Sequence, residues 1–218
     1  MIINKLLIQV PIFFLLGGLA TFFLEPYRLY PLIFCFSFAI FRICGTSNLK
    51  DTFYFSFSFA FGWFFLGLYW IANAFLVKSG FYLFLMPIAA TLLPIFLSLI
   101  WSTAFFIAKL ISSKIGEIHI NSIIILSIFE YLRGKLFQFP WLMPGNFFSS
   151  DEIFIQGFSF IGSYSMNIIF LFIVIFPILI IKYKKQSLLP VFFILTPTII
   201  LFIKSYDRYL NKPMNSFN

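Results

Sequence analysis

Charge is what this sequence has least of. Only 10% of its 218 residues are charged, whereas a soluble domain carries roughly 25%. Hydrophobic residues make up 61% of the chain, and the mean hydropathy is +1.02. This is too little polar material to cover a surface that faces water. The composition therefore excludes an ordinary soluble domain and makes the bilayer the expected solvent for most of the chain.

Cysteine and histidine are also scarce. The two cysteines, Cys35 and Cys44, lie in or beside one apolar segment without metal-ligand spacing, so we interpret them as small apolar residues of a membrane helix. His119 is the single histidine, near Glu117, and no nucleophile is evident in reach of it. We expect it to be an interface residue. Because the sequence also lacks a Gly-rich phosphate loop, a Gly-x-Ser-x-Gly turn and a metal cluster, we predict no catalytic residue, no metal and no cofactor.

The net charge of +8 does not indicate a nucleic-acid partner. The densest group of basic residues is Lys182, Lys184 and Lys185, and it follows a long apolar run. Basic residues that flank a membrane segment are arranged in this way. We therefore predict that the protein binds no nucleic acid.

Apolar runs recur along the whole chain with no soluble-looking stretch between them. The expected helices are 6–24, 29–43, 52–77, 79–108, 118–132, 153–181 and 188–203. About 20 helical residues cross a ~30 Å hydrocarbon core. The prediction is an all-α integral membrane protein, a bundle of about seven transmembrane helices in one domain over 1–205, with a polar tail over 206–218. A signal peptide is the alternative for the first run, but that run ends at Pro26 and not at a small-residue cleavage site.

The distribution of Lys and Arg predicts the orientation. With the N-terminus inside, eight basic residues lie in cytoplasmic segments and four in outer loops, before three more in the tail. The inner eight are Lys5, Arg42, Lys50, Lys109, Lys114, Lys182, Lys184 and Lys185, and the outer four are Arg28, Lys78, Arg133 and Lys135. This bias favours a cytoplasmic N-terminus and a C-terminus on the far side of the membrane.

The stretch Glu130-Tyr131-Leu132-Arg133-Gly134, followed by Phe139-Pro140-Trp141-Leu142, is the most informative. Glu130 and Arg133 are three residues apart and can pair on one helix face, and Gly134 can close that helix. Ionisable residues at a membrane boundary are candidates for function. The alternative is a snorkelling ion pair with a tryptophan in the interfacial belt.

Two weaker candidates lie elsewhere. Tyr69, Trp70 and Asn73 end a long apolar run and could meet a lipid headgroup or serve as an ordinary interface anchor. The small and polar residues 162–167 open a later helix, where close helix packing is the better explanation.

The order of these signatures resembles the membrane part of apolipoprotein N-acyltransferases. It runs over roughly residues 5–205. The shared elements are Glu25-Pro26-Tyr27 with Pro31, Tyr69-Trp70-Ile71, Glu130-x-x-Arg133-Gly134, Phe139-Pro140-Trp141-Leu142 and Gly162-x-Tyr164-Ser165. The resemblance implies a bacterial inner-membrane enzyme of lipoprotein biosynthesis. Such an acyltransferase moves an acyl chain from a phospholipid to the α-amino group of a diacylglyceryl-cysteine lipoprotein, through a thioester on a catalytic Cys aided by Glu and Lys.

The resemblance also implies a nitrilase-like catalytic domain between a seventh and an eighth helix, and no position of this sequence matches its catalytic Glu, Lys or Cys. We therefore expect the membrane half of such an enzyme, truncated or split, with a separately encoded nitrilase-like domain as a possible partner. Phospholipid and diacylated lipoprotein are the expected substrates, and the candidate lipid-rim residues are Glu130, Arg133, Pro140, Trp141, Tyr69 and Trp70. The alternatives are an inactive remnant of the enzyme and a small membrane transporter.

Overall fold

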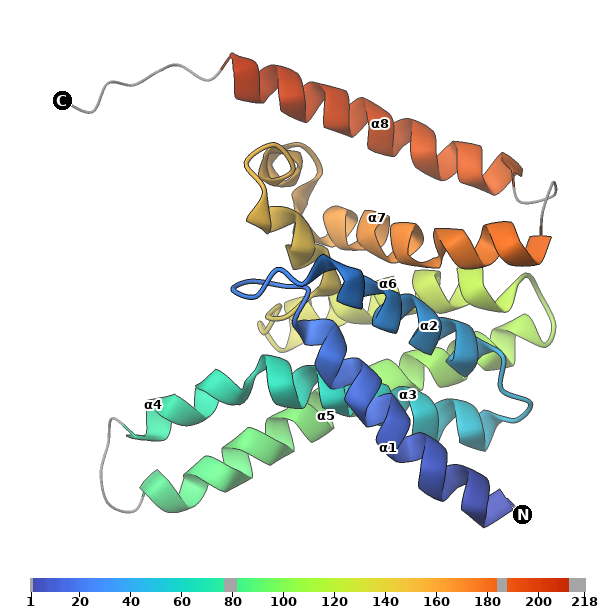
Figure 1. Ribbon diagram of the computed structural model, residues 1–218, viewed down its shortest axis with the longest axis vertical. Coiled ribbons are helices and arrows are strands. Elements are labelled where there is room, and N and C mark those ends of the chain that lie inside the picture. The colour runs from blue at the N-terminus through green and yellow to red at the C-terminus, as the bar shows by residue number, and fades with distance from the viewer. Residues whose placement is uncertain (1, 77–81, 184–187, 212–218) are drawn as a thin grey trace. The chain divides into compact units, whose positions relative to one another are not determined.

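The computed structural model describes residues 2–76, 82–183 and 188–211, and within these ranges it describes all side chains except those of 2–7, 76, 82, 183, 188–195 and 197. The chain forms two compact units, residues 1–142 and 143–218, and each is described by itself. All regular elements of the described residues are helices, which confirms the all-α class (Figure 1). The basic residues Lys78, Lys184 and Lys185, the helix boundaries expected at Val77 and Ser79, and the end of the polar tail, 212–218, lie outside the described residues.

Two described helices are long and apolar enough to cross a membrane. They cover Leu83–Ser112 and Ile155–Lys182. A third crossing results if the bent pair Leu49–Gly67 and Tyr69–Phe75 is one span, and Ile8–Thr21 and Tyr30–Cys44 are shorter apolar helices. The apolar helices indicate a membrane protein. The expected count of about seven spans is not confirmed, because fewer of the described helices are long and apolar enough to cross a membrane.

The first unit begins with two helices that run parallel to each other. These are α1 (Ile2–Thr21) and α3 (Leu49–Gly67), linked by the 3-10 turn η1 (Tyr30–Leu32) and by α2 (Ile33–Cys44). Adding a Cβ to Gly17 would place it 1.9 Å from the Phe59 carbonyl oxygen, and a Cβ on Gly62 would lie 2.0 Å from that of Phe14. Glycine at both positions therefore lets the two backbones touch, as small residues do at helix contacts in membranes.

The helix expected over 52–77 has different bounds and a break inside it. α3 starts earlier because Asn48 caps it, accepting a hydrogen bond from the Asp51 amide at 2.7 Å. It ends at Gly67, after which η2 (Tyr69–Ala72) and α4 (Asn73–Leu76) continue at an angle of 52°. Gly67 has the low helix propensity typical of glycine, and a Cβ there would lie 2.1 Å from a Leu142 methyl carbon. The helix therefore breaks where Leu142 packs against it.

Two further helices complete the first unit. α5 (Tyr82–Ser112) lies beside α3, η2 and α4, and α6 (Ile118–Leu136) packs against it (Figure 1). The side chain of Glu117 caps α6 by accepting from the amides of His119 and Ile120. α6 continues to Leu136, so the expectation that Gly134 closes the helix is wrong, because Gly134 is an interior helical residue.

The second unit contains η3 (Pro144–Ser150), α7 (Ile155–Tyr183) and α8 (Leu188–Leu210). α7 carries a kink at Gly162, whose φ of 77° is in the left-handed region that glycine tolerates. η3 packs on α7 so closely that a Cβ on Gly145 would lie 2.4 Å from the Cα of Asn167. α8 extends to Leu210 and does not end at Ile203.

Candidate functional site

Glu130 and Arg133 form a buried, two-pronged ion pair on α6. The Nη2 of Arg133 donates to Oε2 of Glu130 at 2.6 Å, and its Nε donates to Oε1 at 2.9 Å. Each residue is only 1% exposed. The pair therefore does not snorkel to the membrane surface, because its charges are enclosed by the first unit. A buried pair is tolerated when its geometry is good and its remaining donors and acceptors are satisfied.

Three other groups satisfy the rest of the pair. The Nη1 of Arg133 donates to the carbonyl oxygens of Phe139 at 2.9 Å and of Trp141 at 3.0 Å. The indole Nε1 of Trp101, on α5, donates to Oε1 of Glu130 at 2.6 Å. Through these bonds the pair connects α5, α6 and the segment after α6. We call Glu130, Arg133 and Trp101 the clamp.

The segment after α6 has an unusual backbone that the clamp and α3 hold in place. Gln138 has a φ of 52° and Leu142 a φ of 58°, both in the left-handed region that residues other than glycine seldom adopt. The indole Nε1 of Trp63 donates to the Leu142 carbonyl at 3.2 Å, and the Phe64 ring lies 5.5 Å from the Arg133 guanidinium carbon. Hydrogen bonds to the carbonyls of Phe139, Trp141 and Leu142 therefore restrain this segment.

Four exposed residues lie above this buried support, and we call them the aromatic rim. They are Tyr69 (59% exposed), Trp70 (45%), Trp141 (54%) and the exposed Pro140. The rings of Trp70 and Trp141 meet edge to face, with centroids 5.7 Å apart and an interplanar angle of 62°. The break after α3 brings Trp70 to Trp141. Two of the sequence-predicted motifs thus form one surface, while Glu130 and Arg133 lie beneath it.

Both cysteines of the chain lie on α2. Cys44 is buried at the end of α2, with its Sγ 3.3 Å from the Ser122 Oγ of α6, and Cys35 lies on the same helix. Neither cysteine belongs to the clamp or the rim. Within the described residues, no group of three or more His, Cys, Asp or Glu side chains is placed to hold a metal ion.

The other residues singled out in the sequence have structural surroundings. His119 is 2% exposed, its Nδ1 lies 2.8 Å from Oε1 of Glu117, and its ring is near Phe41. α2 and the cap of α6 thus enclose the imidazole, and the expected place of His119 at the membrane interface stays a prediction. In residues 162–167, Asn167 accepts a hydrogen bond from the Gly145 amide of η3 at 2.8 Å, while a Cβ on Gly162 would meet no atom within 4 Å, so close helix packing does not extend to Gly162.

The sequence did not predict the hydrogen bonds that two tryptophans make at this site. Trp101 and Trp63 are fully buried and supply indole N–H donors to Glu130 and Leu142. A buried tryptophan normally finds a partner for its N–H. An indole inside an uncharged run such as 79–108 was therefore a signal that a polar acceptor lies on a neighbouring helix.

Comparison with known proteins gives one consistent family. The model of the apolipoprotein N-acyltransferase N-terminal domain matches residues 16–176. Apolipoprotein N-acyltransferase of Rhodopseudomonas palustris is 30% identical over 162 residues, which are 71% of this chain and 30% of the relative. The proteins of that name from Sinorhizobium fredii (30% identity; 77% of this chain, 34% of the relative) and Rickettsia typhi (31%; 73% and 32%) are similar. The chain spans about a third of the length of these relatives.

Proposed function

This chain belongs to the family of the apolipoprotein N-acyltransferase N-terminal domain, and we propose that it holds phospholipid and diacylated lipoprotein for acyl transfer. The acyl chain would pass from a phospholipid to the α-amino group of a diacylglyceryl-cysteine. The relatives are named for that activity, and this chain covers about a third of their length. Its part in the reaction is therefore the holding of lipids, with no catalytic residue assigned to it.

The observation that carries this proposal is the rim on its clamp. Exposed Tyr69, Trp70 and Trp141 have the amphipathic rings that settle at lipid headgroups. Beneath them Arg133 binds the carbonyls of Phe139 and Trp141 and thereby restrains the backbone that carries the Trp141 ring. A binding surface that is held rigidly by buried side chains loses less entropy when it binds.

The rim's contribution is positioning and not affinity for hydrocarbon. An acyl chain gains little when it moves from the bilayer to an apolar protein surface, because both surroundings are equally apolar. Placing the ester carbonyl of one lipid and the amine of another in reach of a shared nucleophile can supply several kcal/mol toward a reaction barrier. Glu130 and Arg133 would not touch the lipids. They would contribute by holding the segment that carries Trp141.

The thiol chemistry would come from a nitrilase-like domain outside these 218 residues, on the same or a separately encoded chain. We further propose about seven spans in the bacterial inner membrane, with a cytoplasmic N-terminus and a periplasmic C-terminus. The Lys and Arg distribution supports this orientation. In this orientation the rim would lie at the periplasmic surface, because Tyr69 and Trp70 follow the C-terminal end of α3.

A photoactivatable phospholipid with the label near its headgroup tests the proposal in the full chain in bilayers. Adducts are expected on peptides that contain Trp70 and Trp141. Phe84, a 74% exposed residue of α5, is the control for nonspecific labelling of lipid-facing side chains. Labelling of Trp70 and Trp141 no stronger than that of Phe84 would overturn the lipid-holding role.

Genetic complementation separates the membrane half of an enzyme from an inactive remnant. The chain is expressed with and without a nitrilase-like frame from its own genome, in a strain depleted of lipoprotein N-acylation. Rescue only by the two together is the expected result. No rescue by the pair, with both proteins present in the membrane, would favour the remnant.

A further inference from the structure

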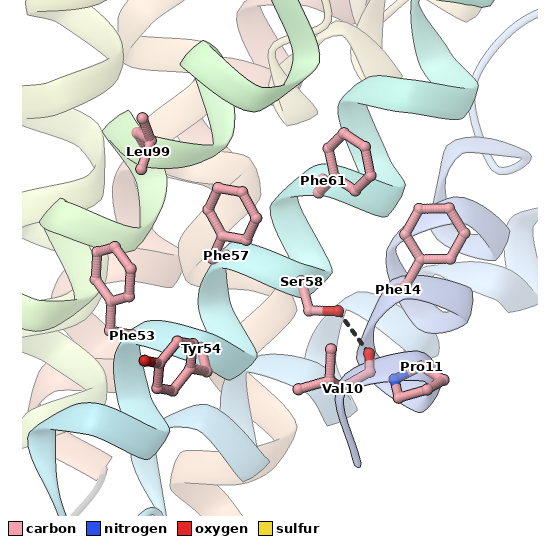
Figure 2. A pocket seen from close by; sticks show the side chains of 9 residues that line it. All are labelled: Val10, Pro11, Phe14, Phe53, Tyr54, Phe57, Ser58, Phe61 and Leu99. Carbon is pink, nitrogen blue, oxygen red and sulfur yellow. Dashed lines mark hydrogen bonds between the residues drawn. The ribbon is translucent and has the colours of Figure 1, made fainter. Parts of the chain in front are cut away.

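The first unit contains an open apolar groove that is separate from the rim. Its walls come from α1, α3 and α5, and its volume is about 580 Å³ (Figure 2). The lining residues are Val10, Pro11, Phe14, Phe53, Tyr54, Phe57, Ser58, Phe61 and Leu99. We call it the α1–α3 groove.

The groove lies on one side of the glycine contact between α1 and α3. The lining residues of α1 precede Gly17, and those of α3 precede Gly62, the two positions where the backbones touch. Because the helices run parallel, the groove lies toward the N-terminal ends of both. Along an ideal helix, Tyr54 is roughly 20 Å from Gly67, after which the rim begins. The groove and the rim thus lie at opposite ends of α3.

The chemistry of the lining selects a hydrocarbon. Aromatic side chains dominate the walls, and the Ser58 hydroxyl is already used, since it donates to the Val10 carbonyl (Figure 2). The other polar group is the Tyr54 hydroxyl, at the end of the groove nearest the start of α3, and none of the described residues forms a hydrogen bond with it. A polar ligand would therefore find few hydrogen-bond partners in the groove. An acyl chain needs no hydrogen bonds, so it would lose nothing there.

A positive charge stands at the same end of the groove. Lys50 is exposed, and it precedes Phe53 by three residues and Tyr54 by four, so all three lie on one face of α3. Asp51, the neighbouring carboxylate, is buried, whereas Lys50 is exposed. Lys50 lies in the first turn of α3, where the helix dipole also favours an anion. An anionic group next to Lys50 would have the Tyr54 hydroxyl as a second partner.

We propose that the α1–α3 groove binds one acyl chain of an anionic phospholipid whose phosphate lies against Lys50 and the Tyr54 hydroxyl. The occupant would be a lipid, because the bilayer supplies acyl chains to any apolar groove that faces it. The charge of Lys50 selects an anionic headgroup. This lipid would occupy the leaflet opposite the rim, so it would be a bound structural lipid and not the acyl donor.

The test is lipid retention by the full chain. The protein is released from nanodiscs of equal phosphatidylglycerol and phosphatidylcholine, and native mass spectrometry counts the lipids that stay bound. One retained phosphatidylglycerol per chain is expected, and Lys50→Gln should reduce its preference over phosphatidylcholine about fivefold, the effect of one lysine near a charged headgroup. Lys114→Gln, which removes another exposed lysine beyond the end of α5, is the matched control and should leave the preference unchanged.

A second pair of variants tests the groove itself. Val10→Phe fills the groove, while Ile12→Phe adds a similar volume at a position of α1 that is 45% exposed and outside the lining. Retained phosphatidylglycerol should be lost in the first and kept in the second, with both variants monodisperse and helical. Equal retention of the two lipids by the unaltered chain, or no difference between the variants and their controls, would overturn the proposal. Labelling of the rim is measured separately, so the two proposals can fail independently.

Discussion

Arg133 binds both carboxylate oxygens of Glu130, at 2.6 and 2.9 Å, in a pair that is almost completely buried. The same guanidinium holds two carbonyls of the segment that carries Trp141. One side chain of a buried ion pair on α6 thus also binds the backbone that carries an exposed tryptophan.

Loss of the buried pair should be costly. Arg133→Met leaves the Glu130 carboxylate buried and unpaired, which costs about 3–5 kcal/mol of stability. Thermal unfolding in detergent measures the effect. Arg28→Met is the matched control, since Arg28 and Glu25 are also three residues apart but their side chains are 53% and 43% exposed, and its cost should stay below about 1 kcal/mol. Equal losses in the two variants would contradict the clamp.

The two buried indoles should differ in their contribution. Trp101→Phe removes the donor to a charged oxygen, and its cost should be about 1.5–3 kcal/mol for the hydrogen bond, in addition to any loss of packing. Trp63→Phe removes a donor to the neutral Leu142 carbonyl, where about 0.5–1.5 kcal/mol is expected. Both residues are fully buried, so each variant is a control for the other. A greater loss in Trp63→Phe would argue against Trp101 as part of the clamp.

Two adjacent glycines of α1 should respond differently to alanine. A Cβ on Gly17 would meet the Phe59 backbone, which can yield only if α3 moves, so Gly17→Ala should destabilise by about 1–3 kcal/mol or more. A Cβ on Gly18 would meet the end of the Leu66 side chain at 2.6 Å, and that side chain can rotate. Thermal unfolding should show the larger shift for Gly17→Ala, and the reverse order would exclude the backbone contact as the cause.

The rim should affect lipid contact without affecting stability. Trp141→Ala removes a side chain that is 54% exposed, so its stability change should remain within about 1 kcal/mol, near the range for surface positions. Headgroup labelling at Trp70 should fall severalfold, because the edge-to-face contact that orients its ring is lost. Phe84→Ala is the control and should leave labelling at Trp70 unchanged.

The sequence by itself determined the features that depend on composition and on neighbours along the chain. Low charge and long apolar runs are enough to predict helices in a bilayer, since unpaired backbone groups cannot be exposed to hydrocarbon. The spacing of Glu130 and Arg133 predicted their pairing, because residues three apart share a helix face. The order of the motifs predicted the family, which the comparison with known proteins confirmed.

The tertiary structure alone decided what depends on residues far apart in the chain. A Cβ on Gly67 would lie 2.1 Å from a Leu142 methyl carbon, and the run 52–77 bends at this point. Trp101 reaches Glu130 from another helix, and Trp70 meets Trp141 across 71 positions of sequence. Local periodicity states which face of a helix is apolar, but not which helix covers it. That packing decided whether Glu130 and Arg133 face lipid, face water or are buried as an ion pair inside the protein.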